Sequence, residues 1–225
     1  IDTSLRLSDV ESCAQFLMTG IDVDRDFCEF YVGTGIAPGG YVWIFPKGED
    51  TANVGIGVLG SKSGKVRAMS LLKDFVKKHL PDGKITEIVV GGVPVRGTIE
   101  RSVADGLMLV GDAAHQANPL TGGGIANAMD AGKIAGEVAA KAIGSGDVCA
   151  KALMEYEKRW RAVIGEEIRK ALIVKNKFLK LNDSDFNRLA ASLEGTNLEE
   201  MTVWGLLKAL VRANPKLLLD LKDLV

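Results

Sequence analysis

The sequence predicts an α/β chain of the α+β type, in which an antiparallel sheet is followed by one strand–loop–helix unit and then by helices. Three observations indicate this class. Segments rich in aromatic and β-branched residues occupy the N-terminal part, a short apolar run near residue 110 leads into a glycine-rich loop, and helical spacing prevails after residue 146. We expect the three parts to occupy residues 1–98, 99–145 and 146–225.

Composition excludes several classes of protein. The 225 residues include 28 Lys and Arg against 29 Asp and Glu, and a net charge of −1 provides no field that would attract nucleic acid. With 47% hydrophobic residues, the chain is globular rather than disordered. The 3 cysteines form no C-x-x-C pair, so we expect no disulfide framework, no metal site and a cytoplasmic location. No run reaches the roughly 20 apolar residues of a membrane-spanning helix.

The N-terminal part contains segments typical of strands. Phe27–Val32 is rich in aromatic and β-branched residues. In Tyr41–Pro46 aromatic residues alternate with aliphatic ones, so its three aromatic residues share one face. Turn residues 48–50 separate this segment from Asn53–Leu59, and the two segments therefore predict a hairpin.

One amphipathic helix is expected between this hairpin and a later strand. Apolar residues recur at helical spacing within Arg67–Leu80, and the turn residues Pro81 and Gly83 end the helix. Ile85–Val95 then returns to a strand pattern.

A second group of elements surrounds the glycine-rich loop. Leu107–Val110 is wholly apolar and predicts a strand buried on both faces, as in a parallel sheet. Small residues recur over Ile125–Ile143 and predict a helix that lies close to its neighbour. We expect Asp147 to cap the helical region that follows, with breaks at 195–197 and 214–215.

The loop between these two elements carries the residues that point to a ligand. Asp112 directly follows the apolar run, and a carboxylate at a strand end can accept hydrogen bonds from hydroxyl groups. Pro119 makes the loop rigid, and glycines 122–124 allow a flat ligand to approach the backbone. The N–H groups of the next helix favour an anionic group. The loop therefore suits a ligand with a polyol chain and an anionic end, such as reduced flavin; the alternative is a tight packing turn.

Two segments resemble known motifs. Gly111–His115, followed by Asn118-Pro119 and the three glycines, resembles the second flavin-binding motif of the FAD-dependent aromatic hydroxylase superfamily. Gly39–Gly48, followed by Asn53–Gly57, resembles the Y-x-W-x-F-P segment of one branch, the geranylgeranyl reductases, which include the digeranylgeranylglycerophospholipid reductases. The chain is therefore similar to the C-terminal portion of such a reductase.

The resemblance implies FAD as the cofactor and a set of site residues. The residues that would bind FAD are Gly111, Asp112, Pro119, Gly122, Gly123, Gly124 and Ile125. The residues that would bind the lipid are Tyr41, Trp43, Phe45 and Pro46. An ordinary core face is the alternative for these aromatic residues. His115 is interpreted as a packing residue rather than a base, and Tyr41 is a candidate proton donor, with water as the alternative.

The implied activity is the reduction of double bonds in a polyprenyl or geranylgeranyl lipid, with an electron donor that the motifs do not identify. Two alternatives stay open: a flavin-dependent monooxygenase of the same fold and a non-catalytic lipid-binding module. An adenosine-binding G-x-G-x-x-G unit is absent, because the one literal match, Gly55–Gly60, lies in the predicted hairpin. We therefore expect this chain alone to bind FAD weakly or not at all, and its uncovered sheet edges to favour self-association.

Two further segments have both a functional and a structural interpretation. The basic segment Ile168–Leu181 predicts either peripheral contact with a membrane or a solvated helix face. The Leu-rich segment Leu206–Val225 predicts either a lid over a lipid cavity or helices packed on the body of the protein.

Overall fold

The computed structural model describes residues 1–64, 66–194 and 205. They form two compact units. One unit consists of Ile1–Val10 and Val93–Lys175, and the other consists of Glu11–Gly92 with the described residues from position 176 onward. The breaks predicted at 195–197 and 214–215 and the Leu206–Val225 segment lie outside the described residues.

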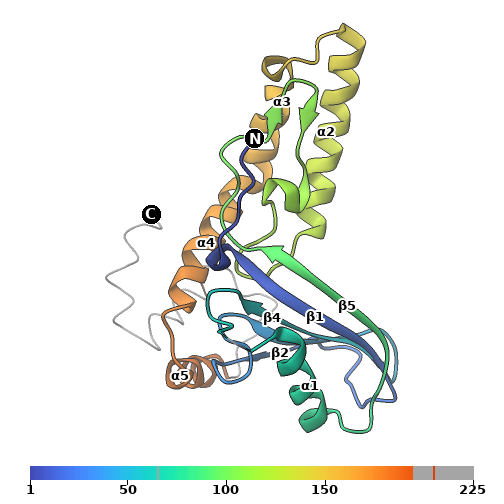
Figure 1. The fold of residues 1–225 in the computed structure, drawn as a ribbon, viewed down its shortest axis with the longest axis vertical. Coiled ribbons are helices and arrows are strands. Elements are labelled where there is room, and N and C mark those ends of the chain that lie inside the picture. Colours follow the sequence, from blue (N-terminus) through green and yellow to red (C-terminus); the bar gives the residue numbers. More distant parts are fainter. Residues whose placement is uncertain (65, 195–204, 206–225) are drawn as a thin grey trace. The chain divides into compact units, whose positions relative to one another are not determined.

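A five-stranded sheet dominates the second of these units (Figure 1). Its strands are β1 (Val10–Thr19), β2 (Glu29–Val32), β3 (Tyr41–Pro46), β4 (Thr51–Leu59) and β5 (Lys84–Pro94), in the order β2-β3-β4-β1-β5. β3 and β4 pair antiparallel with Trp43 opposite Gly55, which confirms the predicted hairpin. β4 also pairs antiparallel with β1, and β3 pairs antiparallel with β2.

The two faces of this sheet differ in what covers them. Helix α1 (Ala68–His79) lies within the predicted segment and packs on one face through Leu72 and Phe75. The strand residues that form the core with α1 include Phe16, Val42, Val54 and Ile56. The three aromatic residues of β3 project to the other face, because side chains alternate along a strand, and none of them belongs to this core cluster.

The other unit is built mainly from consecutive helices. They are α2 (Ile125–Ser145), α3 (Ala150–Trp160), a π-helical turn at Arg161–Gly165 and α4 (Glu166–Phe178) up to Lys175. α2 confirms the helix predicted from the run of small residues. Tyr156 and Trp160 of α3 are completely buried and pack with Ile134 and Val138 of α2 in one core cluster. The remaining elements are the single-turn helices η1 (Leu7–Asp9) and η2 (Gly111–Ala114), the two-stranded pair of β6 (Val103–Ala104) and β7 (Leu107–Met108), and, in the sheet unit, α5 (Asp183–Leu193).

The strand predicted at Leu107–Val110 is shorter and more exposed than expected. Only its first two residues form β7, which pairs antiparallel with the equally short β6. Leu107 is 44% exposed. Within the described residues β7 has no parallel neighbours, and both faces of an apolar strand are covered only when such neighbours and their helices are present.

The predicted cap of the third helix is also wrong. The Asp147 carboxylate accepts the N–H of Cys149 (3.0 Å), one residue before α3 begins. The N–H of Ala150, the first residue of α3, donates instead to the carboxylate of Asp105 (2.7 Å). Because Asp105 lies 45 residues earlier in the chain, only the folded structure brings it to this helix end.

The basic segment Ile168–Leu181 is not a uniformly solvated helix face. Lys175 of α4 is 6% exposed, and its ammonium group donates a hydrogen bond to the carbonyl of Val95. No helix in the described part of the chain is long and apolar enough to cross a membrane.

Candidate functional site

The carboxylate of Asp112 is open to a ligand. Gly111 begins η2 with a φ of +65°, a conformation that glycine adopts without strain. The turn leaves Asp112 exposed, and no hydrogen bond from the described residues reaches its carboxylate. A Cβ placed on Gly124 would lie 3.1 Å from Asp112 Oδ1, so the carboxylate lies beside the residue that precedes α2. Asp112 can therefore accept hydrogen bonds from the hydroxyl groups of a ligand.

Asn118 shapes the loop that leads into α2. Its side-chain oxygen accepts the N–H groups of Leu120 (3.0 Å) and Thr121 (3.3 Å), and its carbonyl accepts the N–H of Gly122 (2.8 Å). The Asn118 N–H donates in turn to the carbonyl of Gly123 (2.8 Å). In this turn, polar groups of the loop are hydrogen-bonded to one another. Because Gly122 has a φ of +71°, a side chain at that position would strain the loop.

The first turn of α2 presents its backbone to solvent. Gly124 is the residue before the helix and has no side chain to cap it, and Ile125 is 82% exposed. The first N–H groups of the helix therefore remain available, together with the partial positive charge of the helix dipole. The side-chain amide of Asn127 is not available to a ligand in the same way, because its nitrogen donates a hydrogen bond to the carbonyl of Gln116 (2.7 Å).

His115 is enclosed beside this loop. Its φ of 50° and ψ of 45° are left-handed, and its side chain is 2% exposed. Burial, together with the positive charge of Arg96, lowers the imidazole pKa below its ordinary value, although a hydrogen bond to the backbone of Thr3 opposes this change. Nδ1 has no hydrogen-bond partner among the described residues. Because the imidazole is enclosed, a substrate in solution cannot reach it, which fits a packing role.

The residues of this loop fit a flavin. An exposed carboxylate that accepts no hydrogen bond from the described residues matches the hydroxyl groups of a ribityl chain. A Cβ at position 124 would fill the space beside that carboxylate, because it would lie between Asp112 Oδ1 (3.1 Å) and the side chain of Ala117 (3.4 Å). Glycine leaves this space open. The helix start supplies N–H groups and partial positive charge for the negative charge that a reduced flavin ring carries.

Four aromatic rings lie on the sheet face that is turned away from α1. The Trp43 ring lies 5.7 Å from that of Tyr41 and 6.0 Å from that of Phe45, centroid to centroid. Phe30 of β2 lies 5.5 Å from both Tyr41 and Phe45. The indole nitrogen of Trp43 donates to the side-chain oxygen of Gln15 (3.2 Å), which fixes the indole against β1. A continuous aromatic surface of this kind suits a hydrocarbon chain.

Gly55 and Gly57 make room for side chains on the sheet and do not form a phosphate-binding loop. Both lie inside β4, as expected. A Cβ on Gly55 would lie 2.2 Å from the ring of Trp43, and a Cβ on Gly57 would lie 2.5 Å from a carboxylate oxygen of Glu11. The literal G-x-G-x-x-G match is therefore explained by the side chains that lie across these two residues.

Tyr41 has a protonated phenol at neutral pH. Burial and, to a smaller extent, the negative charge of Glu11 raise the pKa of Tyr41 to about 12. A phenol in that state can donate a proton and cannot act as a base at physiological pH.

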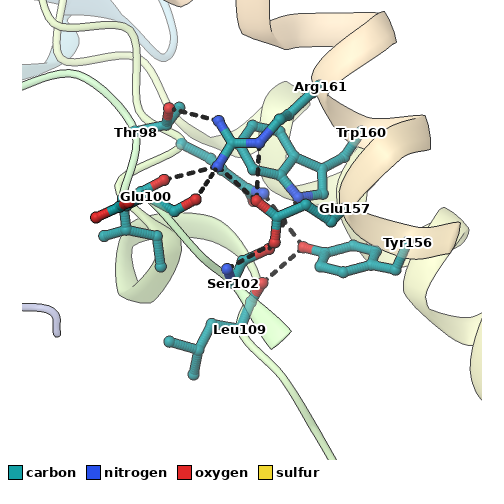
Figure 2. Close-up of polar contacts among 10 residues, drawn as sticks. Thr98, Glu100, Ser102, Leu109, Tyr156, Glu157, Trp160 and Arg161 are labelled. Carbon is teal, nitrogen blue, oxygen red and sulfur yellow. Dashed lines mark hydrogen bonds and ion pairs between the residues drawn. The ribbon is translucent and has the colours of Figure 1, made fainter. Parts of the chain in front are cut away.

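A buried polar cluster anchors α3 to the segment before β6 (Figure 2). The Glu157 carboxylate accepts hydrogen bonds from the backbone N–H of Ser102 (2.7 Å), from its hydroxyl (2.6 Å) and from Nε of Arg161 (2.7 Å). The indole nitrogen of Trp160 donates to the same hydroxyl (3.0 Å), and the Arg161 guanidinium lies over the indole at 4.5 Å. Arg161 also donates to the Thr98 hydroxyl and to the carbonyls of Ile99 and Glu100. This cluster fixes the helix that packs behind the glycine-rich loop.

Within the part of the chain that the structure describes, no group of three or more His, Cys, Asp or Glu side chains is placed to hold a metal ion.

Comparison with known proteins identifies the family. The model of the geranylgeranyl reductase catalytic domain matches residues 9–93. Digeranylgeranylglycerophospholipid reductase 2 of Methanococcoides burtonii is 58% identical over 224 residues, which are 100% of this chain and 55% of the relative. The chain belongs to the geranylgeranyl reductase family. The digeranylgeranylglycerophospholipid reductase of Methanosarcina acetivorans is also 58% identical, over 100% of this chain and 56% of the relative.

Solved structures support the assignment to the geranylgeranyl reductase family. A geranylgeranyl bacteriochlorophyll reductase-like protein from Thermoplasma acidophilum matches with a TM-score of 0.89 and 36% identity, over 99% of this chain and 56% of that protein. A flavin-dependent brominase matches with a TM-score of 0.55 and 19% identity over 76% of this chain and 46% of its own, which shows a shared fold alone. The chain spans about half the length of the geranylgeranyl reductase relatives that it matches.

The site residues predicted from the sequence fall into two groups. The glycines, Asp112 and Ile125 surround one loop in one compact unit, and the aromatic residues with Pro46 lie on β3 in the other. Sequence reasoning missed Asn118 as the organiser of the loop, and it missed Gln116 and Tyr156 altogether. The signal for Asn118 was its position before Pro119 and three glycines, a typical setting for an Asx turn. No local signal marks Gln116 or Tyr156, because their partners are distant in the sequence.

Proposed function

We propose that this chain forms the flavin ring-binding and lipid-binding part of an FAD-dependent reductase that saturates geranylgeranyl double bonds in lipid biosynthesis. The observation that carries the proposal is the Asp112 carboxylate, which lies exposed beside a bare glycine at the start of α2 and accepts no hydrogen bond from the described residues. The relatives that cover the whole chain are named digeranylgeranylglycerophospholipid reductases, which supports both the reaction and the class of lipid.

The loop before α2 would hold the middle and the ring of FAD. Asp112 would accept hydrogen bonds from the ribityl hydroxyls, and Gly122 to Gly124 would leave room for the ring. The start of α2, with Ile125 exposed, would stabilise negative charge on the reduced ring through its N–H groups and dipole. When bound, reduced FAD supplies the hydride that adds to one carbon of the double bond.

The aromatic face of β3 would hold the lipid chain. An isoprenoid tail offers only apolar surface, so it gains free energy when Tyr41, Trp43 and Phe45 shield it from water. Pro46, which ends β3, would close that face. The hydrogen bond between Trp43 and Gln15 holds the indole ready for binding without reorganisation.

Saturation of a double bond needs a proton as well as a hydride. The phenol of Tyr41 would transfer its proton to the second carbon, and water would then return a proton to the phenolate. The pKa of about 12 keeps Tyr41 protonated before this step. Water could supply the proton directly, in which case Tyr41→Phe would retain most of the activity.

The test uses the protein expressed from its complete gene. Its FAD is reduced chemically with dithionite, which replaces the unidentified electron donor, and a geranylgeranyl phospholipid is supplied as substrate. Mass spectrometry should find two hydrogen atoms added for each double bond. Asp112→Ala should weaken FAD binding about tenfold or more, whereas Asp130→Ala, which removes an exposed carboxylate of α2, should not.

Two results would contradict the proposal. Lipid that gains oxygen, with NADPH oxidation stimulated by substrate, would identify a monooxygenase instead. Lipid that binds but is not reduced by the dithionite-reduced protein would identify a non-catalytic lipid-binding module.

A further inference from the structure

A buried hydrogen-bonded bridge lies directly behind the glycine-rich loop. The side-chain oxygen of Gln116 accepts the N–H of Gly111 (2.7 Å), and its amide nitrogen donates to the hydroxyl of Tyr156 (3.2 Å). That hydroxyl donates in turn to the carbonyl of Leu109 (2.6 Å), as Figure 2 shows. Gln116 and Tyr156 are both completely buried. Water therefore does not reach the two hydrogen bonds of the Gln116 side chain.

The bridge holds the backbone on both sides of one residue. Its two backbone ends, the carbonyl of Leu109 and the N–H of Gly111, flank Val110, which immediately precedes η2. Gly111 has the left-handed φ of +65° that turns the chain into η2. Asp112 is the next residue, so the direction of its side chain depends on where Gly111 is held.

The same glutamine also reaches the helix on the other side of the loop. The carbonyl of Gln116 accepts the amide nitrogen of Asn127 (2.7 Å), which lies in the first turn of α2. The Gln116 N–H donates to the carbonyl of Gly111 (3.0 Å). One buried residue therefore ties the turn that carries Asp112 to the start of the helix.

Each group in the bridge has only one orientation that satisfies it. The Gly111 N–H can only donate, so the side-chain oxygen of Gln116 must face it and the amide nitrogen must face Tyr156. The Leu109 carbonyl can only accept, so the Tyr156 proton points to it. Burial raises the pKa of Tyr156, which keeps that proton in place.

We propose that Gln116 and Tyr156 are positioning residues for flavin binding, which hold the Asp112 carboxylate and the start of α2 in the arrangement that FAD requires. Neither residue touches the ligand in this proposal. It rests on the proposed function, because it assigns a role toward FAD.

The experiment measures FAD affinity and thermal stability separately in the protein expressed from its complete gene. Gln116→Met and Tyr156→Phe keep the volume of each side chain and remove its hydrogen bonds. Ser102→Ala is the matched control, because it removes buried hydrogen bonds to Glu157 and Trp160 on the same helix without touching the bridge. Titrations are made well below the melting temperature of every variant, and the visible circular dichroism of the bound flavin is recorded.

We expect both bridge variants to raise the Kd for FAD about tenfold, which corresponds to about 1.4 kcal/mol, and to change the flavin circular dichroism. Ser102→Ala should lower the melting temperature but leave both flavin measurements unchanged. A Kd within twofold of the unmodified protein in Gln116→Met would overturn the proposal, and so would an equal loss of affinity in Ser102→Ala. If Asp112→Ala also leaves the affinity unchanged, the proposed function itself fails.

A second measurement needs neither a variant nor FAD. The Gly111 amide hydrogen should exchange with solvent at least about a hundredfold more slowly than an unprotected amide, because its acceptor is a buried side chain. Exchange at the unprotected rate would show that the bridge is not formed and would overturn the proposal.

Discussion

Removal of the Glu157 carboxylate should destabilise the helical unit strongly. In Glu157→Ala, the buried N–H and hydroxyl of Ser102 lose their acceptor, and Arg161 loses its ion-pair partner. A buried donor left unsatisfied costs about 1–3 kcal/mol, and removal of one partner from a buried ion pair costs about 3–5 kcal/mol. The two figures describe overlapping losses and are not added. Because the Arg161 side chain is 35% exposed and water can solvate it, we expect a total loss at the lower end of the ion-pair range, about 3 kcal/mol.

Urea unfolding followed by tryptophan fluorescence measures this loss, since Trp160 is buried in the same cluster. For an m-value of about 3 kcal/mol per molar urea, the midpoint should fall by about 1 M. The control is Glu155→Ala on the same helix, whose partner Lys141 is 72% exposed, and which should cost less than about 0.5 kcal/mol. A loss below about 1 kcal/mol in Glu157→Ala would refute the reasoning.

The same carboxylate makes a prediction about pH. Burial alone would raise the pKa of Glu157, but hydrogen bonds from Ser102 and Arg161 outweigh it and hold the pKa below its ordinary value of 4.5. A group whose pKa is lowered by folding stabilises the fold fully above its unfolded pKa and loses that contribution as the pH falls through its folded pKa. The unmodified protein should therefore lose stability below pH 4.5 more steeply than Glu157→Gln, as urea midpoints across that range would measure.

Four further predictions concern other regions. Burial, with the charge of Glu11, raises the pKa of the Cys13 thiol to about 12, so a thiol reagent at pH 8 should label the other two cysteines, which are exposed, much faster than Cys13. Gly55→Ala should displace the indole of Trp43 and cost about 1–3 kcal/mol in thermal unfolding, whereas Gly35→Ala, which meets no atom within 4 Å, should cost little. The 225-residue chain alone should retain far less than one FAD per chain after gel filtration, because its sequence lacks a strand–helix G-x-G-x-x-G turn for the pyrophosphate; stoichiometric flavin absorbance would contradict this. Val90 of the edge strand β5 is 65% exposed, so Val90→Lys should reduce any concentration-dependent association seen by sedimentation, and an unchanged profile would exclude this edge as the contact.

Regular elements with strong local patterns were predictable from the sequence. Aromatic and aliphatic residues alternate along β3, and the observed strand has the predicted bounds. α1 and α2 were also found within a few residues of their ends, because apolar or small residues recur at helical spacing between turn-forming residues. β7 was predicted less well, since burial of an apolar run depends on neighbours that its own residues do not specify.

The loop that carries the candidate site was partly predictable. Asp112 and the glycines stand out because an acidic residue and a bare backbone at the end of an apolar run have few structural explanations. The roles of Gln116 and Tyr156 were not predictable, because the two residues are 40 positions apart and each is ordinary in its local context. The residue that accepts the first N–H of α3 was not predictable for the same reason, because Asp105 lies 45 residues away in the sequence.

By itself, the sequence determined the local conformations, the alternation that sorts aromatic side chains from aliphatic ones on β3, and the flavin-like motif around Asp112, because these depend on neighbours within a few positions along the chain. Only the tertiary structure decided which buried polar groups satisfy one another. Hydrogen-bond partners must meet within about 3 Å with correct geometry, and residues far apart in the sequence reach that distance only when packing has fixed the path of the backbone between them.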